Sequence, residues 1–262
     1  MLLLLTRHRE LTLHLARREI TDRYLGQVFG SLWAIGHPLV LIGVYVFIFG
    51  FVFRLKVGDG RQVPFDYTTY LLAGLIPWLC LVESMSKATV AITMNANLVK
   101  QIVFPVEVLP VKGVIASLIT QAISIILLLV YVLTKYHTLE WTYALLPLLM
   151  LLQSLFMIGL AYLLSSIGVY FRDLKDLVQV FCTVGVFTVP IFFLPEQIPE
   201  LFRPLLYANP ICYIVLCYQD ALYAGRLVHG WAWIIFPTMS VGLFYLGYRI
   251  FRKLKIMFGN VL

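Results

Sequence analysis

Residues 142–169 read TYALLPLLMLLQSLFMIGLAYLLSSIGV, a stretch without a charged side chain. A helix needs about 20 mostly apolar residues to cross the hydrocarbon core of a bilayer, so this stretch predicts a transmembrane helix. The whole chain agrees, because 61% of its 262 residues are hydrophobic and only 13% are charged. Soluble domains carry about 45–50% apolar and about 25% charged residues. The sequence predicts an all-α polytopic membrane protein.

Six stretches have the length and apolarity of membrane-spanning helices. They cover residues 31–54, 69–91, 108–134, 142–169, 177–194 and 231–251. The segments between them are rich in Gly, Pro, Asn and charged residues, which is typical of loops. We therefore expect six transmembrane helices.

Residues 195–230 contain two apolar pieces, each too short to span a membrane. They can be two short re-entrant helices or one poor seventh span. Cytosolic loops are enriched in Lys and Arg, and this rule decides between the two. With six spans and both termini in the cytosol, only six of the 20 Lys and Arg residues lie outside: Arg54, Lys56, Arg61, Lys135, Arg203 and Arg226. A seventh span would put the basic C-terminus outside, so we expect a re-entrant helical hairpin between spans five and six.

The N-terminal segment, residues 7–25, mixes five arginines with apolar residues. Leu11, Leu15 and Ile20 fall roughly along one helical face, which predicts an amphipathic helix lying on the membrane surface. An ordinary positive patch beside the membrane is the alternative. Either way, topology explains the net charge of +7, and nucleic acid is not an expected partner.

The chain is expected to form a single transmembrane domain over residues 1–262. Its parts are a cytosolic interface helix in 1–30, spans one to five in 31–194, a re-entrant periplasmic segment in 195–230, and span six with a cytosolic tail in 231–262.

Few ionisable residues lie inside the predicted spans, although such residues are the usual functional candidates there. Glu83 and Lys87 are spaced i,i+4 and can pair on one helix face. His37 precedes a proline, which favours a packing role. The four cysteines lack metal-ligand spacing and sit in apolar surroundings, so we expect packing roles and no metal site. An ion-coupled carrier is disfavoured, because no series of buried carboxylates runs through the chain.

The chain contains no GxxxxGK[ST] phosphate loop. If ATP drives transport, another polypeptide must bind it. No cofactor is therefore expected in this chain.

Several short motifs occur in a fixed order along the chain. They are Gly30-Ser31-Leu32-Trp33 with Pro38, Gly74-Leu75-Ile76-Pro77-Trp78, Asn95-Ala96-Asn97-Leu98-Val99-Lys100 with Phe104-Pro105, Phe171-Arg172-Asp173-Leu174-Lys175-Asp176, Pro190, Ile198-Pro199 and Asn209-Pro210. In this order and spacing the chain resembles, over nearly its whole length, the permease subunits of ABC-type polysaccharide exporters. Those permeases move lipid-linked O antigen, capsule or teichoic acid chains.

The resemblance implies a bacterial inner-membrane permease and not an enzyme. The expected partners are a second copy of the chain, two copies of a nucleotide-binding ATPase subunit that holds ATP and magnesium, membrane lipids and a polyprenyl-linked polysaccharide. The alternatives are an ABC permease for a drug or haem, or a membrane-embedded transferase acting on polyprenyl lipids. Such an enzyme needs convergent carboxylates or histidines near one interface, whereas Glu83, His37 and Asp220 are scattered in sequence.

The resemblance also implies site residues. Those facing the ATPase are Asn95, Asn97, Lys100, Arg172, Asp173 and Lys175. Those meeting the lipid diphosphate are Arg17, Arg18 and Arg23, because guanidinium groups suit phosphate geometry. The sugar channel would be lined by Tyr45, Trp78 and Phe187. The periplasmic gate would contain Pro199, Asn209 and Pro210.

Overall fold

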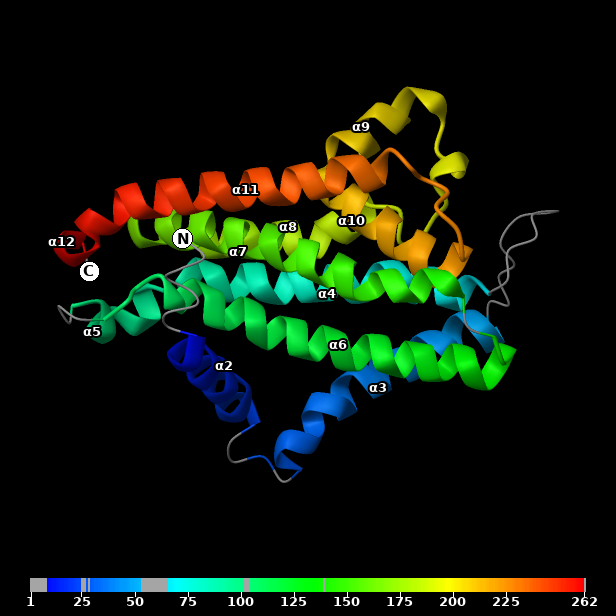
Figure 1. Cartoon of the computed structure of the whole chain (residues 1–262), viewed down its shortest axis with the longest axis horizontal. Helices are drawn as coiled ribbons and strands as arrows, with labels where there is room; N and C mark the ends of the chain where they lie inside the picture. Colours follow the sequence, from blue (N-terminus) through cyan, green and yellow to red (C-terminus); the bar gives the residue numbers. More distant parts are fainter. Residues whose placement is uncertain are drawn as a thin grey trace.

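The computed structural model describes residues 9–24, 27, 29–52, 66–100, 104–138 and 140–261, and all regular structure within these ranges is helical (Figure 1). The predicted all-α class is confirmed for this part of the chain. The α-helices are α2 (Arg9–Tyr24), α3 (Trp33–Tyr45), α4 (Tyr67–Val90), α5 (Ala96–Val99), α6 (Val108–Tyr136), α7 (Leu146–Tyr170), α8 (Leu174–Gly185), α9 (Arg203–Ala208), α10 (Pro210–Gln219), α11 (Ala232–Leu254) and α12 (Phe258–Val261).

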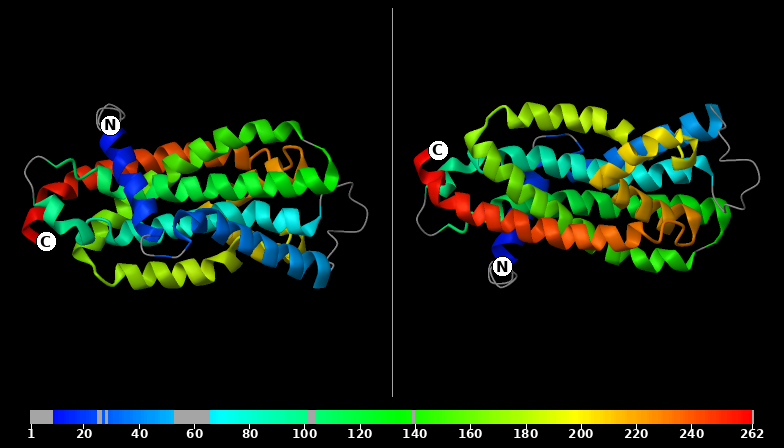
Figure 2. Two further views of the ribbon diagram at one scale, coloured as in Figure 1. Left: turned by 90° about the horizontal axis from the view of Figure 1, so that it is seen from below. Right: turned by 90° about the horizontal axis from the view of Figure 1, so that it is seen from above.

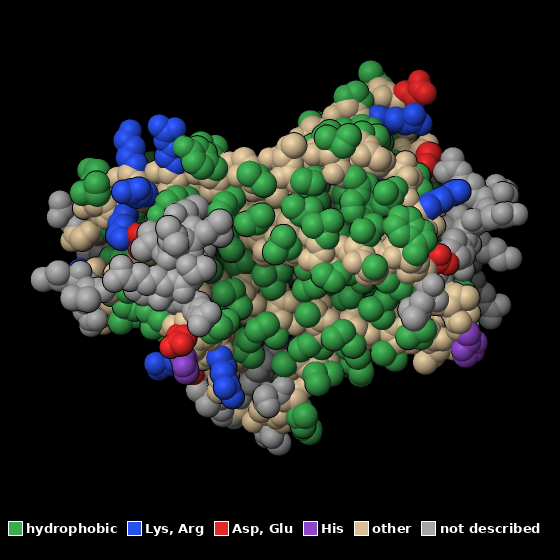
Figure 3. Space-filling view, viewed as in Figure 1, with side chains coloured by type: hydrophobic (Ala, Val, Ile, Leu, Met, Phe, Trp, Pro, Cys, Tyr) green, Lys and Arg blue, Asp and Glu red, His purple; other side chains and the backbone are tan. Residues whose placement is uncertain are grey.

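Four helices in the described ranges are long and apolar enough to cross a membrane. They are Tyr67–Val90, Val108–Tyr136, Trp141–Tyr170 and Ala232–Met257. Each matches a predicted span to within a few residues. They run side by side along the long axis of the molecule (Figure 1). Hydrophobic side chains cover the middle of the face in Figure 3, and Lys and Arg gather mainly toward the end that holds the C-terminus. This is the charge pattern of a membrane-embedded bundle.

Helix α4 forms the centre of the bundle, and 83% of its most apolar stretch is buried. Asp66 caps its start by accepting hydrogen bonds from the backbone N–H and the hydroxyl of Thr69, at 3.2 and 2.7 Å. The same carboxylate pairs with Lys135 of α6 at 2.6 Å and accepts from Tyr131 at 2.9 Å. These contacts fix the start of α4 to the end of α6.

Helices α7 and α11 approach each other through glycine. A Cβ on Gly247 would lie 2.1 Å from the backbone oxygen of Gly159, and one on Gly159 would lie 2.5 Å from the oxygen of Leu243. Small residues allow this close packing of helices in membranes, where dispersion contacts replace the hydrophobic effect.

The first predicted span, 31–54, is helical over all its described residues, and few of them are buried. It consists of the 3-10 turn Gly30–Leu32, α3 and a π-helical continuation, η2 (Val46–Val52), and residues 53–54 lie outside the described residues. Only Pro38 and Ile42 are buried in α3. This helix diverges from the bundle at its N-terminal end (Figure 1).

The fifth predicted span, 177–194, differs from the structure in its second half. Helix α8 ends at Gly185, and a single 3-10 turn continues it to Thr188. Val189 then takes an extended conformation, with φ −122° and ψ 153°. Pro190 causes this break, because a proline disfavours the helical conformation of the residue before it.

The N-terminal helix α2 packs against α6 through its small side chains. Thr12 and Ala16 are buried, whereas Leu11, Leu15 and Ile20 are half-buried and Leu13 is exposed. Glu19 continues this face and pairs with Lys112 of α6 at 3.1 Å. Small side chains and an ion pair therefore attach α2, and its leucines are spread around the helix instead of forming one face.

Candidate functional sites

The connector between α4 and α6 carries the first group of predicted ATPase-contact residues. It contains a 3-10 turn, Thr93–Asn95, followed by the short helix α5. The Asn95 side chain donates to the carbonyl of Ala91 at 2.8 Å and fixes the turn to the end of α4. Leu98 and Val99 pack inward against a cluster that includes Ile92, Val169 and Phe258. The connector is therefore anchored on its apolar side.

The opposite side of this connector faces outward. Asn97 and Lys100 are exposed there. Met94 is 79% exposed and was not predicted. Its signal in the sequence is a large apolar residue in a polar connector, which is a feature of protein contact surfaces.

The second predicted contact, the connector from α7 to α8, lies near the first. Arg172, Asp173 and Lys175 are all exposed. A Cβ on Gly168, near the end of α7, would lie 2.2 Å from the backbone oxygen of Thr89, near the end of α4. This close approach brings the two connectors to one end of the bundle, where the C-terminal helix α12 also packs.

The predicted lipid-diphosphate residues are on α2. Arg17 is exposed, and Arg18 pairs with Asp22 at 3.3 Å while remaining exposed. The backbone of Arg23 belongs to α2, but its side chain lies outside the described residues. Both described arginines are open to solvent or headgroups.

The predicted re-entrant segment forms two helical pieces, Glu200–Ala208 and Pro210–Ala224, that meet at an angle of 98°. Asn209 stands at the bend. Its side-chain oxygen accepts from the N–H of Ile211 at 3.0 Å and caps α10, while its amide donates to the hydroxyl of Thr188 at 2.9 Å. Pro210 occupies the first turn of α10, where a missing N–H costs nothing. Pro199 and Pro210 are both exposed.

Helices α9 and α10 have opposite environments. Leu201, Phe202 and Leu205 are exposed on and just before α9, at 82, 56 and 74%. In α10, by contrast, every residue from Ile214 to Gln219 is buried. The second helix is thus part of the core, and the first lies across its surface (Figure 1).

The non-helical turn after α8 is held by side chains that the sequence analysis did not select. The Tyr67 hydroxyl donates to the carbonyl of Phe192 at 2.6 Å. The Tyr70 hydroxyl shares its proton between the carbonyls of Pro190 and Phe193, at 2.9 and 2.8 Å. Gln219 of α10 donates to the carbonyl of Pro190 at 2.6 Å. Irregular backbone at membrane depth needs such internal partners.

Asp220 follows α10 and is only 1% exposed. Its carboxylate accepts from the backbone N–H of His229 at 2.9 Å and from the indole N–H of Trp233 at 3.0 Å. The ring Nδ1 of His229 lies 2.9 Å from it. These contacts join the end of the bent pair to the start of α11.

The predicted channel aromatics do not come together within one chain. Trp78 is 2% exposed and lies against Phe181 of α8, with ring centroids 6.3 Å apart. Phe187 is 66% exposed and stacks on Phe192 at 5.7 Å. Tyr45 is half-buried and stacks on Phe49 at 5.9 Å. From Phe49 the ring contacts continue through Tyr67, Tyr70 and Tyr223.

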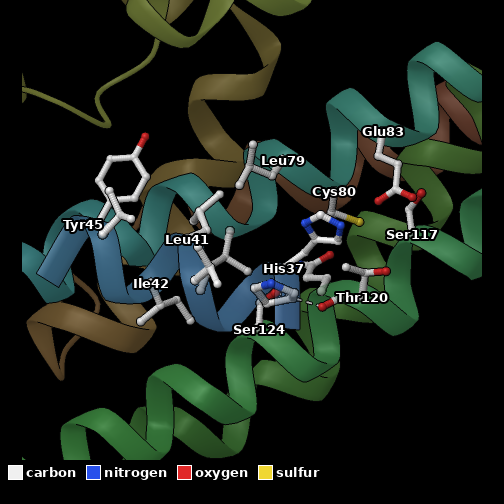
Figure 4. A pocket seen from close by; sticks show the side chains of 15 residues that line it. His37, Leu41, Ile42, Tyr45, Leu79, Cys80, Glu83, Ser117, Thr120 and Ser124 are labelled. Carbon is white, nitrogen blue, oxygen red and sulfur yellow. Dashed lines mark hydrogen bonds between the residues drawn. The ribbon is translucent and has the colours of Figure 1, made fainter. Parts of the chain in front are cut away.

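A pocket of about 450 Å³ lies between α3, α4 and α6, with Tyr45 at one end and Glu83 at the other (Figure 4). Its walls are mostly apolar, with polar groups from Glu83, Ser117, Thr120 and Ser124 on one side. Ser117, Thr120 and Ser124 each donate to a carbonyl four residues earlier in α6. Glu83 pairs with Lys87 at 2.9 Å, as the spacing predicted.

Within the described ranges, no three His, Cys, Asp or Glu side chains come together as a metal site would require. The four cysteines are buried and free, in accord with packing roles.

The bundle, its apolar middle and its two polar connectors at one end define a multi-pass membrane protein. The model of the ABC-2 type transporter family matches residues 10–223. This chain belongs to that family, and it supplies a transmembrane subunit that is not itself an ATPase. The predicted resemblance to ABC-type permeases is confirmed.

Similarity to individual relatives extends over nearly the full chain. An O-antigen export system permease protein of Myxococcus xanthus is 30% identical over 258 residues, covering 98% of this chain and 96% of the relative. One of Klebsiella pneumoniae is 29% identical over 257 residues, covering 97% and 95%. A polysialic acid transport protein of Escherichia coli is 23% identical over 243 residues, covering 90% of each.

Proposed function

We propose that this chain is the membrane subunit of an exporter for lipid-linked polysaccharide in the bacterial inner membrane. The observation that carries the proposal is the end-to-end similarity to O-antigen export permeases. The chain works as a homodimer, with two ATPase subunits that bind ATP and magnesium. Six spans place both termini in the cytosol, with α3 and η2 as the first span, α8 with the turn after it as the fifth, and the bent pair re-entering from the periplasm.

The connector end of the bundle is the proposed ATPase surface. Asn97 and Lys100 are exposed on one connector, and Arg172 and Lys175 on the other. An anchored apolar side, as at Leu98 and Val99, suits a segment that transmits force, because it cannot move without the bundle. Met94 joins this surface as an apolar contact.

The remaining predicted sites keep their proposed roles. Arg17, Arg18 and Arg23 meet the lipid diphosphate at the interface helix. Pro199, Asn209 and Pro210 belong to the periplasmic gate, and the Asn209 bonds to α10 and Thr188 support a hinge there. Tyr45, Trp78 and Phe187 are proposed to line the channel. The exposed Phe187 fits that role in one chain, whereas the buried Trp78 would need α8 to move.

Expression together with the adjacent ATPase tests the coupling surface. Lys100→Glu should lower the amount of ATPase that copurifies by about tenfold, because one reversed charge at an interface commonly costs more than 1 kcal/mol. Arg226→Glu, the same reversal on an exposed residue of another loop, should leave the complex intact. Equal ATPase recovery with both variants would remove the coupling assignment. A strain that lacks this chain should accumulate the polysaccharide inside the cell. If it does not, the chain is not the exporter of that polysaccharide.

Thiol labelling tests the orientation. The natural cysteines are buried, so a membrane-impermeant maleimide should label only introduced ones. Arg226→Cys should react from the periplasm in intact cells, and Lys175→Cys only after the cytosol is opened. The reverse pattern would overturn the six-span topology.

A further inference from the structure

The outward face of α11 ends in three cations, and no acidic side chain in the described part of the chain pairs with them. Arg249, Arg252 and Lys253 are exposed, and no carboxylate of the described residues lies within ion-pair distance of them. Lys255, one turn further along, does pair with Glu107 at 2.7 Å. Like charges at i,i+3 and i,i+4 repel one another on a helix. The cluster therefore favours an anion from outside the chain.

The three cations and two tyrosines line one hollow. Its volume is about 530 Å³, and its walls are Tyr245, Tyr248, Arg249, Arg252 and Lys253. Their spacing puts all five on one face of α11. The ring of Tyr248 packs edge-on against the ring of Tyr162 of α7 at 5.7 Å, so the floor of the hollow is fixed to the bundle. The Tyr245 side chain is 65% exposed.

The same helix face continues as an apolar stripe away from the cations. Ile234, Val241 and Tyr245 lie along it and are exposed at 69, 55 and 65%. From Ile234 to Tyr245 the helix rises about 16 Å at about 1.5 Å per residue. This is close to the thickness of one leaflet, since the hydrocarbon core of a bilayer is about 30 Å across. Only 22% of the most apolar stretch of Ala232–Met257 is buried, so the stripe is open to lipid.

The exposed side chains along this face of α11 are therefore first apolar, then aromatic and then basic, over about the length of a lipid molecule. We propose that this face binds an anionic glycerophospholipid. Its acyl chains lie along Ile234 and Val241, and its phosphate is held by Arg249, Arg252 and Lys253. Arginine binds phosphate through two parallel N–H groups, and tyrosine hydroxyls suit the headgroup boundary. A basic pocket at the membrane surface is a known form of lipid recognition.

Spin-labelled lipids in proteoliposomes of phosphatidylcholine test this site. The purified chain with its ATPase should immobilise labelled phosphatidylglycerol at least about fivefold better than labelled phosphatidylcholine, which is the preference expected from a single basic group near the surface. The triple variant R249Q/R252Q/K253Q should lose the preference. The control Arg226→Gln removes an exposed cation that belongs to no proposed site and should keep it.

Other results would overturn the proposal. The unmodified complex could show no preference for the anionic lipid, or the triple variant could keep the preference. The control could also lose the preference as fully as the triple variant, which would indicate an effect of diffuse charge. If the triple variant loses the ATPase but keeps the lipid preference, the three cations form a contact surface for the ATPase instead. If the triple variant does not insert into the membrane, the salt dependence of the lipid preference is measured on the unmodified complex instead. The preference should fall between 0.1 and 1 M salt, since the screening length falls from about 10 to about 3 Å, and an unchanged preference would contradict it.

Discussion

Helices α3 and α4 follow one another in the sequence and are both apolar, but their environments are opposite. In α4, 83% of the most apolar stretch is buried, and its contacts reach α6, α7, α8 and α10. In α3 only Pro38 and Ile42 are buried, and Leu39, Val40 and Val44 are about half exposed. In both views of Figure 2, α8 and the end of α3 lie along the same edge of the bundle. Leu177, Val180 and Val184 of α8 are exposed as well.

The difference shows that an apolar helix in this chain lies in the membrane but does not have to lie in the protein core. Lipid is as apolar as leucine, so an outward helix needs no polar face. What distinguishes α4 is fit: glycines at close approaches and polar side chains with buried partners. Substitutions that disturb this fit should therefore be costly in or against α4 and neutral in α3.

Among substitutions in α3 and at the contacts of α4, the largest effect is expected where α7 touches the backbone of α4. In Gly168→Ala the new Cβ would lie 2.2 Å from the backbone oxygen of Thr89, which cannot move aside like a side chain. We expect a loss of about 3 kcal/mol or more of stability. Fluorescence-detected gel filtration should show little intact protein. Gly242→Ala, where the added Cβ meets nothing within 4 Å, is the matched control.

Gly74→Leu should come next. A Cβ there would lie 3.0 Å from both the Gln219 amide nitrogen and the Val215 side chain, and 3.2 Å from Ile191. These atoms belong to side chains that can shift partly, so a loss of about 1–3 kcal/mol is expected. Thermal unfolding in detergent measures it. A melting temperature equal to that of the unmodified protein would show that α10 can withdraw from α4 without cost.

The start of α4 should depend on pH. Burial alone would raise the pKa of Asp66, but hydrogen bonds from Lys135, Thr69 and Tyr131 and the charge of Lys135 hold it below its ordinary value. A lowered pKa means that the ionised carboxyl stabilises the fold at neutral pH, and that this gain is lost as the pH falls below about 4. Asp66→Asn should cost about 1–2 kcal/mol at pH 7. The melting temperatures of the two proteins should converge in acid, and a constant gap would contradict the assignment.

The smallest effect is expected in α3. A Cβ on Gly43 meets nothing within 4 Å, so Gly43→Leu should change the stability of the isolated chain by less than about 0.5 kcal/mol. Gly74→Leu makes the same substitution in α4, so the difference between the two variants measures the effect of position alone. A drop as large as that of Gly74→Leu would mean that α3 packs as tightly as α4.

The long helices could be predicted from sequence because length and apolarity are what the bilayer selects. The predicted span 69–91 falls within two residues of α4, and 108–134 within two of α6. The break after α8 could not be located in the same way. Pro190 is visible in the sequence, but an apolar run continues through it, and only the tertiary partners Tyr67, Tyr70 and Gln219 make the broken backbone stable.

The exposure of a side chain could be predicted where local chemistry decides it, and not where the rotation of a helix decides it. Polar residues of short connectors must be near the surface, and Asn97, Lys100, Arg172 and Lys175 are exposed there. The spacing of Glu83 and Lys87 was enough to predict their ion pair. The burial of Trp78 and the exposure of Phe187 depend on how helices turn about their axes, and a uniformly apolar helix carries no sequence pattern that fixes this angle.

The turn that follows α8 has one more consequence. The carbonyls of Phe192 and Phe193 accept hydrogen bonds from α4, and that of Pro190 accepts from both α4 and α10, so α4 cannot move away from the turn without leaving oxygen atoms bare. In hydrocarbon each bare carbonyl costs several kcal/mol. Where water can follow the moving helix, each oxygen is solvated at once and this cost disappears. Water must therefore reach the turn before α4 can move away from it. As long as the interior is dry, the turn stays bonded to α4.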